Sequence, residues 1–289
     1  MQNVTSETIW TAGKVLGWAA KDFRERGVPT PRLEAELLLA HVLGCRRLDL
    51  YTEHDRPLDT DELTAYREAI ARRRRGEPAA YVTGAREFWS LELEIDEHVL
   101  VPRPETEILV QACLERLAGD AALDLGTGSG CVAVALASER DDLRVDAVDV
   151  SPAACEVARR NAERHGLADR ITVLEGNLFD PVPDGSRYAA IVTNPPYVIG
   201  AEIDTLSAEV RREPRLALDG GADGLEVIRR ILDRAPEFLE PGGWLLTELD
   251  PRQAATVARE LGPAALGVEG EIIGDLTGRD RVVAFSKRP

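Results

Sequence analysis

The sequence has few cysteines, few histidines and no long apolar run. No stretch approaches the roughly 18 uncharged apolar residues of a membrane-spanning helix. The first residues, MQNVTSETIW, also lack the basic start and the apolar run of a signal peptide. These absences predict a soluble cytoplasmic protein that makes no contact with a membrane.

The cysteines and histidines also lack the spacing of metal ligands. The histidines show no HExxH pattern, and no two cysteines form a CxxC pair; the cysteines are Cys45, Cys113, Cys131 and Cys155. Neither a zinc site nor a disulfide framework is therefore expected. We predict no metal site and reduced, packed cysteine side chains.

Positive charge is scarce in the second part of the chain. Residues 1–80 hold 13 Lys or Arg and 13 Asp or Glu, so the whole net charge of −16 lies in residues 81–289. A negative field repels phosphate backbones, whereas proteins that bind nucleic acid usually carry a basic face. No direct binding of nucleic acid is expected, although a local basic groove stays compatible with this charge.

The first 76 residues show a helical pattern. Three segments have apolar residues at helical spacing, with capping residues before them and a glycine after them: residues 5–27, 31–44 and 59–76. Ser6 or Thr5 is the expected cap of the first. We predict a small helical bundle over residues 1–76 and interpret it as a docking domain for a protein substrate, because its charge is balanced and its pattern is separate.

Four arginines, Arg72–Arg75, end the third of these segments. They could form a docking patch for an acidic partner. The favoured alternative is a solvated helix end, where cations suit the negative end of the helix dipole.

Residues 77–105 change character and form a connector. The alternation in LELEI predicts a β-hairpin, and Pro102 and Pro104 stop any helix and stiffen the entry to the next region. From Ala121 onward, short apolar strands alternate with helical stretches, which is typical of a parallel sheet covered by helices. Near the end, GVEGEIIGD and RVVAFSK predict an antiparallel hairpin.

The first strand of this region runs into DLGTGSGCVA, with Gly126, Gly128 and Gly130 where the strand turns into a helix. Asp149 lies 23 residues after Gly126 at the end of the next strand, where an acidic side chain binds ribose hydroxyls. We therefore expect a nucleotide-containing cofactor. The dinucleotide fingerprint needs its third glycine where Cys131 stands, so the spacing favours a ligand without phosphates, such as S-adenosylmethionine.

Other residues are expected to join this cofactor site. Thr127 and Ser129 belong to the same loop, and Asn177 and Leu178 end the third strand, where they could meet the adenine by hydrogen bonding and by packing. A purely structural glycine turn is the alternative.

The stretch TNPPY follows the apolar strand YAAIV. The residue before a proline is held extended, so Asn194 is fixed at the strand tip, and neither Pro195 nor Pro196 has an N–H. The loop is therefore a rigid hydrogen-bond acceptor with one amide side chain.

This set of groups suits a planar nitrogen that carries two hydrogens. The Asn194 side-chain oxygen and the Pro195 carbonyl could each accept one N–H, which would turn the nitrogen lone pair toward a methyl sulfonium. Tyr197 could pack on the flat group. We assign the catalytic role to Asn194 and Pro195, and substrate binding to Asn194, Pro195, Pro196 and Tyr197.

These motifs together resemble the HemK/PrmC family, S-adenosylmethionine-dependent methyltransferases that modify the glutamine of the Gly-Gly-Gln motif in peptide-chain release factors. The resemblance spans nearly the whole chain and rests on RRRRGEPAAYVTGAREFW, PRPETE, DLGTGSGCVAVALA, AVDVS, TNPPYV and DLTGRDRVV. It implies a class I methyltransferase fold: a Rossmann-like, mostly parallel seven-stranded α/β sheet with a C-terminal antiparallel hairpin, in residues 106–289, after the small helical bundle.

The resemblance also implies roles for particular residues. Gly126–Gly130, Asp149, Leu178 and Asn194 are expected at the cofactor, and Asn194–Tyr197 at the substrate glutamine. REFW and PRPET are expected to border the pocket. The family commonly has EIG after the fifth strand, but Asp250-Pro251 follows Glu248-Leu249 here, so we expect a helix that starts at Pro251 with Asp250 as its cap.

Three other functions compete with this reading. An adenine- or guanine-amino methyltransferase of nucleic acid acts on an NH2 group of the same geometry, but the acidic sheet region opposes it. A NAD-dependent oxidoreductase is disfavoured by the glycine spacing and by NPPY. A binding module that retains S-adenosylmethionine without catalysis is the third alternative.

Overall fold

The computed structural model describes residues 9–288. The contacts divide the chain after Gly84 into two compact units, which we call the helical unit and the sheet unit. The segment 77–84 thus belongs with the helices, and the hairpin with the sheet; the division at residues 76 and 105 stays a prediction. No helix in the described part of the chain is long and apolar enough to cross a membrane.

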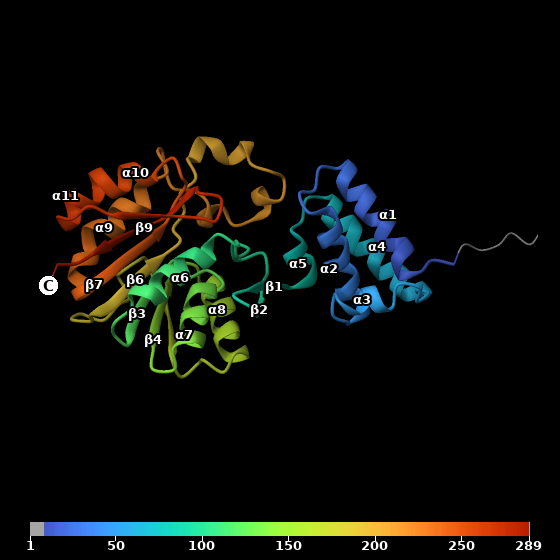
Figure 1. The fold of residues 1–289 in the computed structure, drawn as a ribbon, viewed down its shortest axis with the longest axis horizontal. Helices are drawn as coiled ribbons and strands as arrows, with labels where there is room; N and C mark the ends of the chain where they lie inside the picture. Colours follow the sequence, from blue (N-terminus) through green and yellow to red (C-terminus); the bar gives the residue numbers. More distant parts are fainter. Residues whose placement is uncertain (1–8, 289) are drawn as a thin grey trace, which may run out of the picture. The chain divides into compact units, whose positions relative to one another are not determined.

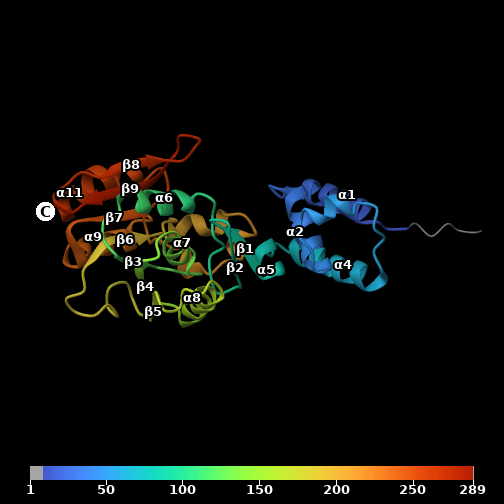
Figure 2. The ribbon, with the colours of Figure 1, turned by 60° about the horizontal axis from the view of Figure 1, so that its bottom comes forward.

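The helical unit is built around three longer helices that lie side by side (Figures 1 and 2). Its helices are α1 (Ala12–Glu25), α2 (Pro31–Leu43), α3 (Asp49–Thr52), α4 (Thr60–Arg74) and α5 (Ala79–Thr83). Asp59 caps α4 with a reciprocal capping box, and Gly44, the glycine that closes the second predicted segment, ends α2 in the left-handed conformation. The predicted caps Ser6 and Thr5 lie outside the described residues, and Thr11 caps α1.

The arginines at the end of α4 have a role that neither interpretation of Arg72–Arg75 included. The Arg73 side chain is only 5% exposed and forms an ion pair with Glu34 of α2. Arg74 forms an ion pair with Asp22 of α1 at 2.6 Å. These two arginines therefore tie α4 to both neighbouring helices.

The sheet unit contains the predicted seven-stranded sheet, in the order β5-β4-β3-β6-β7-β9-β8. The first five strands in this order are parallel, and β9 and β8 add the predicted antiparallel hairpin. The strands are β3 (Ala121–Leu125), β4 (Arg144–Asp149), β5 (Ile171–Glu175), β6 (Tyr188–Thr193), β7 (Leu239–Glu248), β8 (Glu271–Gly274) and β9 (Asp280–Ser286). The predicted connector hairpin is β1 (Ala85–Phe88) with β2 (Leu91–Glu94).

Helices cover both faces of this sheet (Figure 1). Alternate residues of a strand point to opposite faces, and Leu123, Ile191 and Leu245 pack with Ile228 and Leu232 of α9. The opposite face is covered by three helices that contact one another in chain order. The main helices are α6 (Thr106–Arg116), α7 (Cys131–Glu139), α8 (Pro152–Arg164) and α9 (Glu226–Phe238). The predicted fold class is confirmed.

Two irregular stretches complete the sheet unit. The excursion between β6 and α9 contains the 3-10 turns η1 (Gly200–Thr205), η2 (Val210–Arg212) and η3 (Arg215–Ala217). After β7 come α10 (Ala254–Thr256), the π-helical η4 (Val257–Leu261) and α11 (Gly262–Leu266).

The prediction that a helix starts at Pro251 is wrong. The Asp250 carboxylate accepts a hydrogen bond from the Arg252 backbone N–H at 2.9 Å, but this closes a turn, and α10 begins at Ala254. The turn places Gln253 directly before the helix.

Candidate active site

A cavity opens at the carboxyl ends of the parallel strands of the sheet unit. Its lining comes from residues 98–106, 124–132, 148–154, 176–178 and 193–196, and from others between 214 and 230. The chain runs from β3 outward to β5 and then returns to the other side of β3 with β6. Ligands of open α/β sheets bind where the strand order reverses in this way.

The register of β3 and β6 brings the glycine loop and TNPPY together. Leu125 is paired with Thr193, and the Thr193 hydroxyl donates to the Leu125 carbonyl at 2.7 Å. Each strand ends there, so the two loops begin side by side.

The glycines of the loop divide into two kinds. Gly126 and Gly128 have φ of 72° and 55°, line the cavity, and have no atom within 4 Å of where a Cβ would stand. They leave room for a ligand against the backbone. Gly130, with φ of 79°, is not among the lining residues; a Cβ there would lie 3.2 Å from the Ala158 Cα. Gly130 therefore allows α7 to approach α8.

Asp149 lines the cavity and also holds the glycine loop. Its carboxylate accepts hydrogen bonds from the backbone N–H groups of Gly128 at 2.8 Å and Ser151 at 2.9 Å. Burial raises the pKa of this carboxyl above its ordinary value, and the backbone bonds oppose that shift. A change at Asp149 would consequently disturb the shape of the loop as well as the wall of the cavity.

A second carboxyl, Asp124, lines the cavity and was missed by the sequence analysis. It is buried, burial raises its pKa to about 7, and the Thr127 hydroxyl donates to it at 2.6 Å. Its place directly before the glycine loop, in DLGTGSG, was the available signal. Thr127 and Ser129 line the cavity as well.

Asn177 and Leu178 reach the cavity at the end of β5. The Asn177 side-chain oxygen accepts from Arg230 at 2.9 Å, which leaves its NH2 group and one lone pair of its oxygen for a ligand. Leu178 has a φ of 52°, uncommon for a residue with a side chain.

Asn194, Pro195 and Pro196 line the cavity, whereas Tyr197 does not. The Asn194 NH2 group donates to the Thr106 hydroxyl at 3.2 Å, which leaves its side-chain oxygen as an acceptor for a ligand. The Tyr197 hydroxyl lies 3.5 Å from a carboxylate oxygen of Glu248, at the limit of a hydrogen bond.

The connector contributes through PRPET and not through REFW. Pro102, Arg103 and Thr106 line the cavity, but residues 86–89 are not among the lining residues, which corrects that expectation. Arg103 forms a two-bond ion pair with the buried Glu213 at 2.7 and 2.8 Å, which attaches the excursion between β6 and α9. Sequence reasoning missed the excursion because it has no periodic pattern; Pro214, Leu216 and Ala217 line the cavity from it.

Comparisons with known proteins agree with this arrangement. A family profile described as "PrmC N-terminal domain" matches residues 14–84, and one described as "Methyltransferase small domain" matches residues 104–212. The "Release factor glutamine methyltransferase" of Geobacter sulfurreducens is 49% identical over 86% of this chain and 87% of that protein. The protein of the same name from Rhodopirellula baltica is 40% identical over 99% of this chain and 100% of that protein.

Solved structures show the same fold in the sheet unit. A methyltransferase from Pyrococcus furiosus matches with a TM-score of 0.53 at 25% identity, over 69% of this chain and 90% of that one. A 16S rRNA N2 G1207 methyltransferase of T. thermophilus, solved with AdoMet and guanosine, matches with a TM-score of 0.51 at 20% identity. The match covers 71% of this chain and 50% of that one. The likeness to the second shows the fold alone.

Glu248 is the buried carboxyl next to the Tyr197 hydroxyl of the NPPY loop. From its burial we predict that the stability of the protein depends on pH. Its exposed fraction is 1%, and burial raises its pKa to about 7 from an ordinary 4.5, against the opposing effect of the Thr106 hydroxyl. Between these pH values the folded protein holds a proton that the unfolded chain has lost. The free energy of unfolding should therefore fall as the pH rises through this window.

Glu248→Gln removes this titration, so its free energy of unfolding should depend less steeply on pH between 4.5 and 7 than that of the wild type. Urea unfolding at several pH values measures both slopes. Glu269→Gln removes one acidic residue from an exposed position and serves as the matched control. Equal slopes for Glu248→Gln and wild type would contradict the raised pKa.

Proposed function

The chain belongs to the release factor glutamine methyltransferase family, and on that premise we propose that it transfers a methyl group from S-adenosylmethionine to the side-chain amide nitrogen of the glutamine in the Gly-Gly-Gln motif of peptide-chain release factors. One observation carries the proposal: a loop that offers acceptor oxygens to a ligand, Asn194–Pro196, lines the same cavity as a glycine loop bonded to the Asp149 carboxylate. The first suits an amide NH2, and the second suits a cationic nucleoside cofactor.

The cavity fits S-adenosylmethionine better than a dinucleotide. The Asp149 carboxylate lines it and is bonded to the glycine loop, where a pyrophosphate would meet like charge and a sulfonium would meet opposite charge. Of the cavity's arginines, Arg103 is paired with Glu213 and Arg230 is bonded to Asn177. We assign Asp149 to the ribose hydroxyls, and Leu178 and Asn177 to the adenine.

The residues of the NPPY loop act by orientation. When bound, S-adenosylmethionine supplies an electrophilic methyl group. The Asn194 side-chain oxygen and the Pro195 carbonyl each accept one N–H of the substrate amide, which fixes the NH2 group in its plane. An amide nitrogen is a poor nucleophile because its lone pair is delocalised, and these two acceptors stabilise the positive charge that grows on it. Transfer of the methyl group from sulfur to nitrogen would leave S-adenosylhomocysteine and a positively charged nitrogen. That nitrogen then loses one of its two N–H protons to water, which gives the neutral N-methyl amide.

The main rival is a methyltransferase that acts on an amino group of adenine or guanine in nucleic acid. Its acceptor has the same planar NH2, and the T. thermophilus structural relative is named for an rRNA guanine. The net charge of −16 opposes a phosphate backbone, and the helical unit matches a PrmC N-terminal domain profile. We propose release factors as the partner, with no direct contact to nucleic acid and the helical unit as the docking part.

The assay that separates these functions offers several acceptors to the protein with radiolabelled S-adenosylmethionine. Intact release factor should be methylated, and tRNA, ribosomes and DNA should not. A short peptide carrying Gly-Gly-Gln should react more slowly than the intact protein, because it lacks the surface for the helical unit. Label on nucleic acid alone, or on no acceptor, would overturn the proposed function.

Asp149→Ala should weaken S-adenosylmethionine binding by on the order of 1.5 to 3 kcal/mol, since it removes a charge-assisted hydrogen bond to ribose. Asp149→Asn keeps one acceptor oxygen and should lose less. Titration calorimetry measures both affinities, with NAD as the ligand that should not bind. An unchanged affinity for Asp149→Ala, or binding of NAD in place of S-adenosylmethionine, would refute this assignment.

Asn194→Ala should leave folding nearly intact and lower the rate of methyl transfer by about 10²- to 10³-fold, or about 2.7 to 4 kcal/mol, by analogy with loss of one oxyanion-hole donor. Asn194→Asp keeps an acceptor and adds negative charge near a nitrogen that becomes positive, so it should retain more activity than alanine. Single-turnover methylation of a release factor gives the rate, and cofactor binding is measured separately. A wild-type rate for Asn194→Ala would remove NPPY from the mechanism.

A further inference from the structure

The backbone carbonyls of the NPPY loop are packed against two glycines of the excursion between β6 and α9. A Cβ on Gly220 would lie 2.8 Å from the Pro196 carbonyl oxygen, and a Cβ on Gly224 would lie 2.3 Å from the Tyr197 carbonyl oxygen. Gly224 also has a φ of 76°, in the left-handed region. The end of the excursion therefore packs against the backbone of the NPPY loop, where the excursion begins. A residue with a side chain would not fit at either glycine position.

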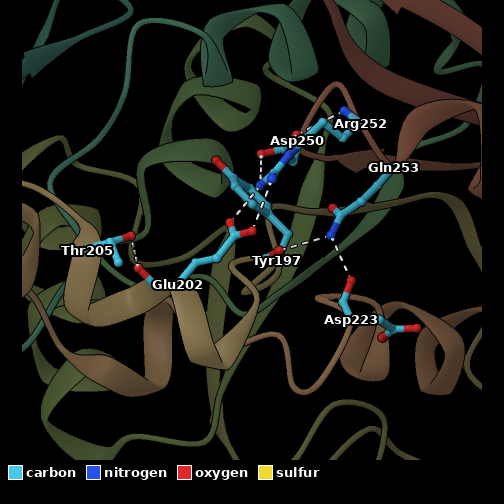
Figure 3. A network of polar contacts seen from close by, with 7 residues as sticks. All are labelled: Tyr197, Glu202, Thr205, Asp223, Asp250, Arg252 and Gln253. Atoms are coloured by element: carbon cyan, nitrogen blue, oxygen red, sulfur yellow. Dashed lines mark hydrogen bonds and ion pairs between the residues drawn. The ribbon is translucent and has the colours of Figure 1, made fainter.

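Gln253 joins the two ends of this excursion (Figure 3). Its side-chain NH2 group donates to the Tyr197 carbonyl at 3.0 Å and to the Asp223 carbonyl at 3.3 Å. The side chain comes from the turn before α10 and points between the two backbone segments. One amide therefore uses both of its N–H groups to hold the exit of the NPPY loop against the return of the excursion.

The oxygen of the Gln253 side-chain amide makes no stabilising contact. Gln253 is only 7% exposed, and its side-chain oxygen is buried with no hydrogen-bond partner among residues 9–288. A buried acceptor without a partner is destabilising. The contribution of Gln253 therefore comes from its NH2 group, which meets two carbonyls that would otherwise lack this donor.

We propose that Gln253 is a positioning residue for methyl transfer, which holds the Tyr197 carbonyl and thereby keeps the acceptor loop Asn194–Pro196 in its reactive placement. The proposal rests on the proposed function, because it assigns Gln253 to the reaction at that loop. Tyr197 directly follows the loop, and among residues 9–288 the side chain that donates a hydrogen bond to its carbonyl is that of Gln253. Gln253 does not line the cavity, so it acts through the loop and not on substrate or cofactor.

The neighbouring Arg252 supplies a matched control. It forms ion pairs with Glu202 at 2.9 Å and Asp250 at 3.0 Å, and its side chain is mostly exposed (Figure 3). Exposed ion pairs contribute little to stability. Arg252→Ala therefore alters the same turn without removing a bond to the NPPY loop.

The first test replaces Gln253 by methionine, which has nearly the same length and no N–H group. Single-turnover methylation of a release factor at saturating S-adenosylmethionine should slow by about 10- to 100-fold, since small misplacement of a reacting group is costly. Cofactor affinity should stay at the wild-type value, because the glycine loop and Asp149 are unchanged. Arg252→Ala should keep the wild-type rate.

The second test uses the pH profile of Gln253→Glu, which a merely structural role would not reproduce. An ionised carboxylate repels both carbonyls, whereas the protonated form can donate to one of them. The rate of this variant relative to wild type should rise as the pH falls from 8 to 6. The ratio cancels the titration of Glu248, the group with a pKa of about 7 that faces Tyr197.

Burial also raises the pKa of Asp124 and of Glu213 to about 7, so these carboxyls titrate in this range in the wild type and in the variant. The charged groups nearest to Gln253 stay ionised. Hydrogen bonds from Arg252 hold the pKa of Glu202 below its usual range, and Arg252 also lowers that of Asp250 against the effect of burial. Hydrogen bonds from Arg229 and from the Leu225 N–H hold the pKa of Asp223 at about 2. The pKa of Arg252 is raised by its bonds to Glu202 and Asp250.

The outcomes separate this proposal from the proposed function. No methylation by the wild-type protein would refute the proposed function itself. A wild type that methylates the release factor, together with a Gln253→Met variant of equal rate, would overturn the positioning role alone. A slow Gln253→Met variant with weakened cofactor binding, or a flat relative pH profile for Gln253→Glu, would also overturn it, because either indicates general loss of structure.

Discussion

The parallel pairing of β3 with β6 is the constraint on which the cavity depends. Leu125 and Thr193 are partners in the register, so the glycine loop and the NPPY loop leave the sheet at the same level. A shift by one residue would turn every side chain of β6 to the opposite face. Its core residues, such as Ile191, would then leave the cluster under α9. Packing of the core thus fixes the distance between the two loops.

The fold was predictable because its patterns are local. Alternating strands and helices and the glycine loop each occupy a few consecutive positions, and the structure contains the predicted strands from β3 to β9 in the predicted order. The same holds for Asp149 and Asn194, which stand at strand ends where the ends of parallel strands meet. Residues whose position follows from one strand could be assigned from the sequence.

The remaining parts of the site depend on contacts between distant segments. The pairing of Arg103 with Glu213 spans 110 residues, and that of Gln253 with Tyr197 spans 56. No spacing rule indicates either contact, since the excursion has no repeat to place it over the cavity. The start of α10 was mispredicted for a related reason: Asp250 and Pro251 fit a helix start, but the carboxylate also fits the turn that forms.

The absence of N–H groups at Pro195 and Pro196 has a consequence for selectivity. A glutamine side chain brings two hydrogens to the acceptors of this loop, while a glutamate of almost the same shape brings only oxygens and a negative charge. In the proposed binding mode, oxygen would then face oxygen, with no donor from the prolines to relieve the repulsion. A loop that holds the substrate in this way would discriminate against a deamidated side chain by charge and not by size.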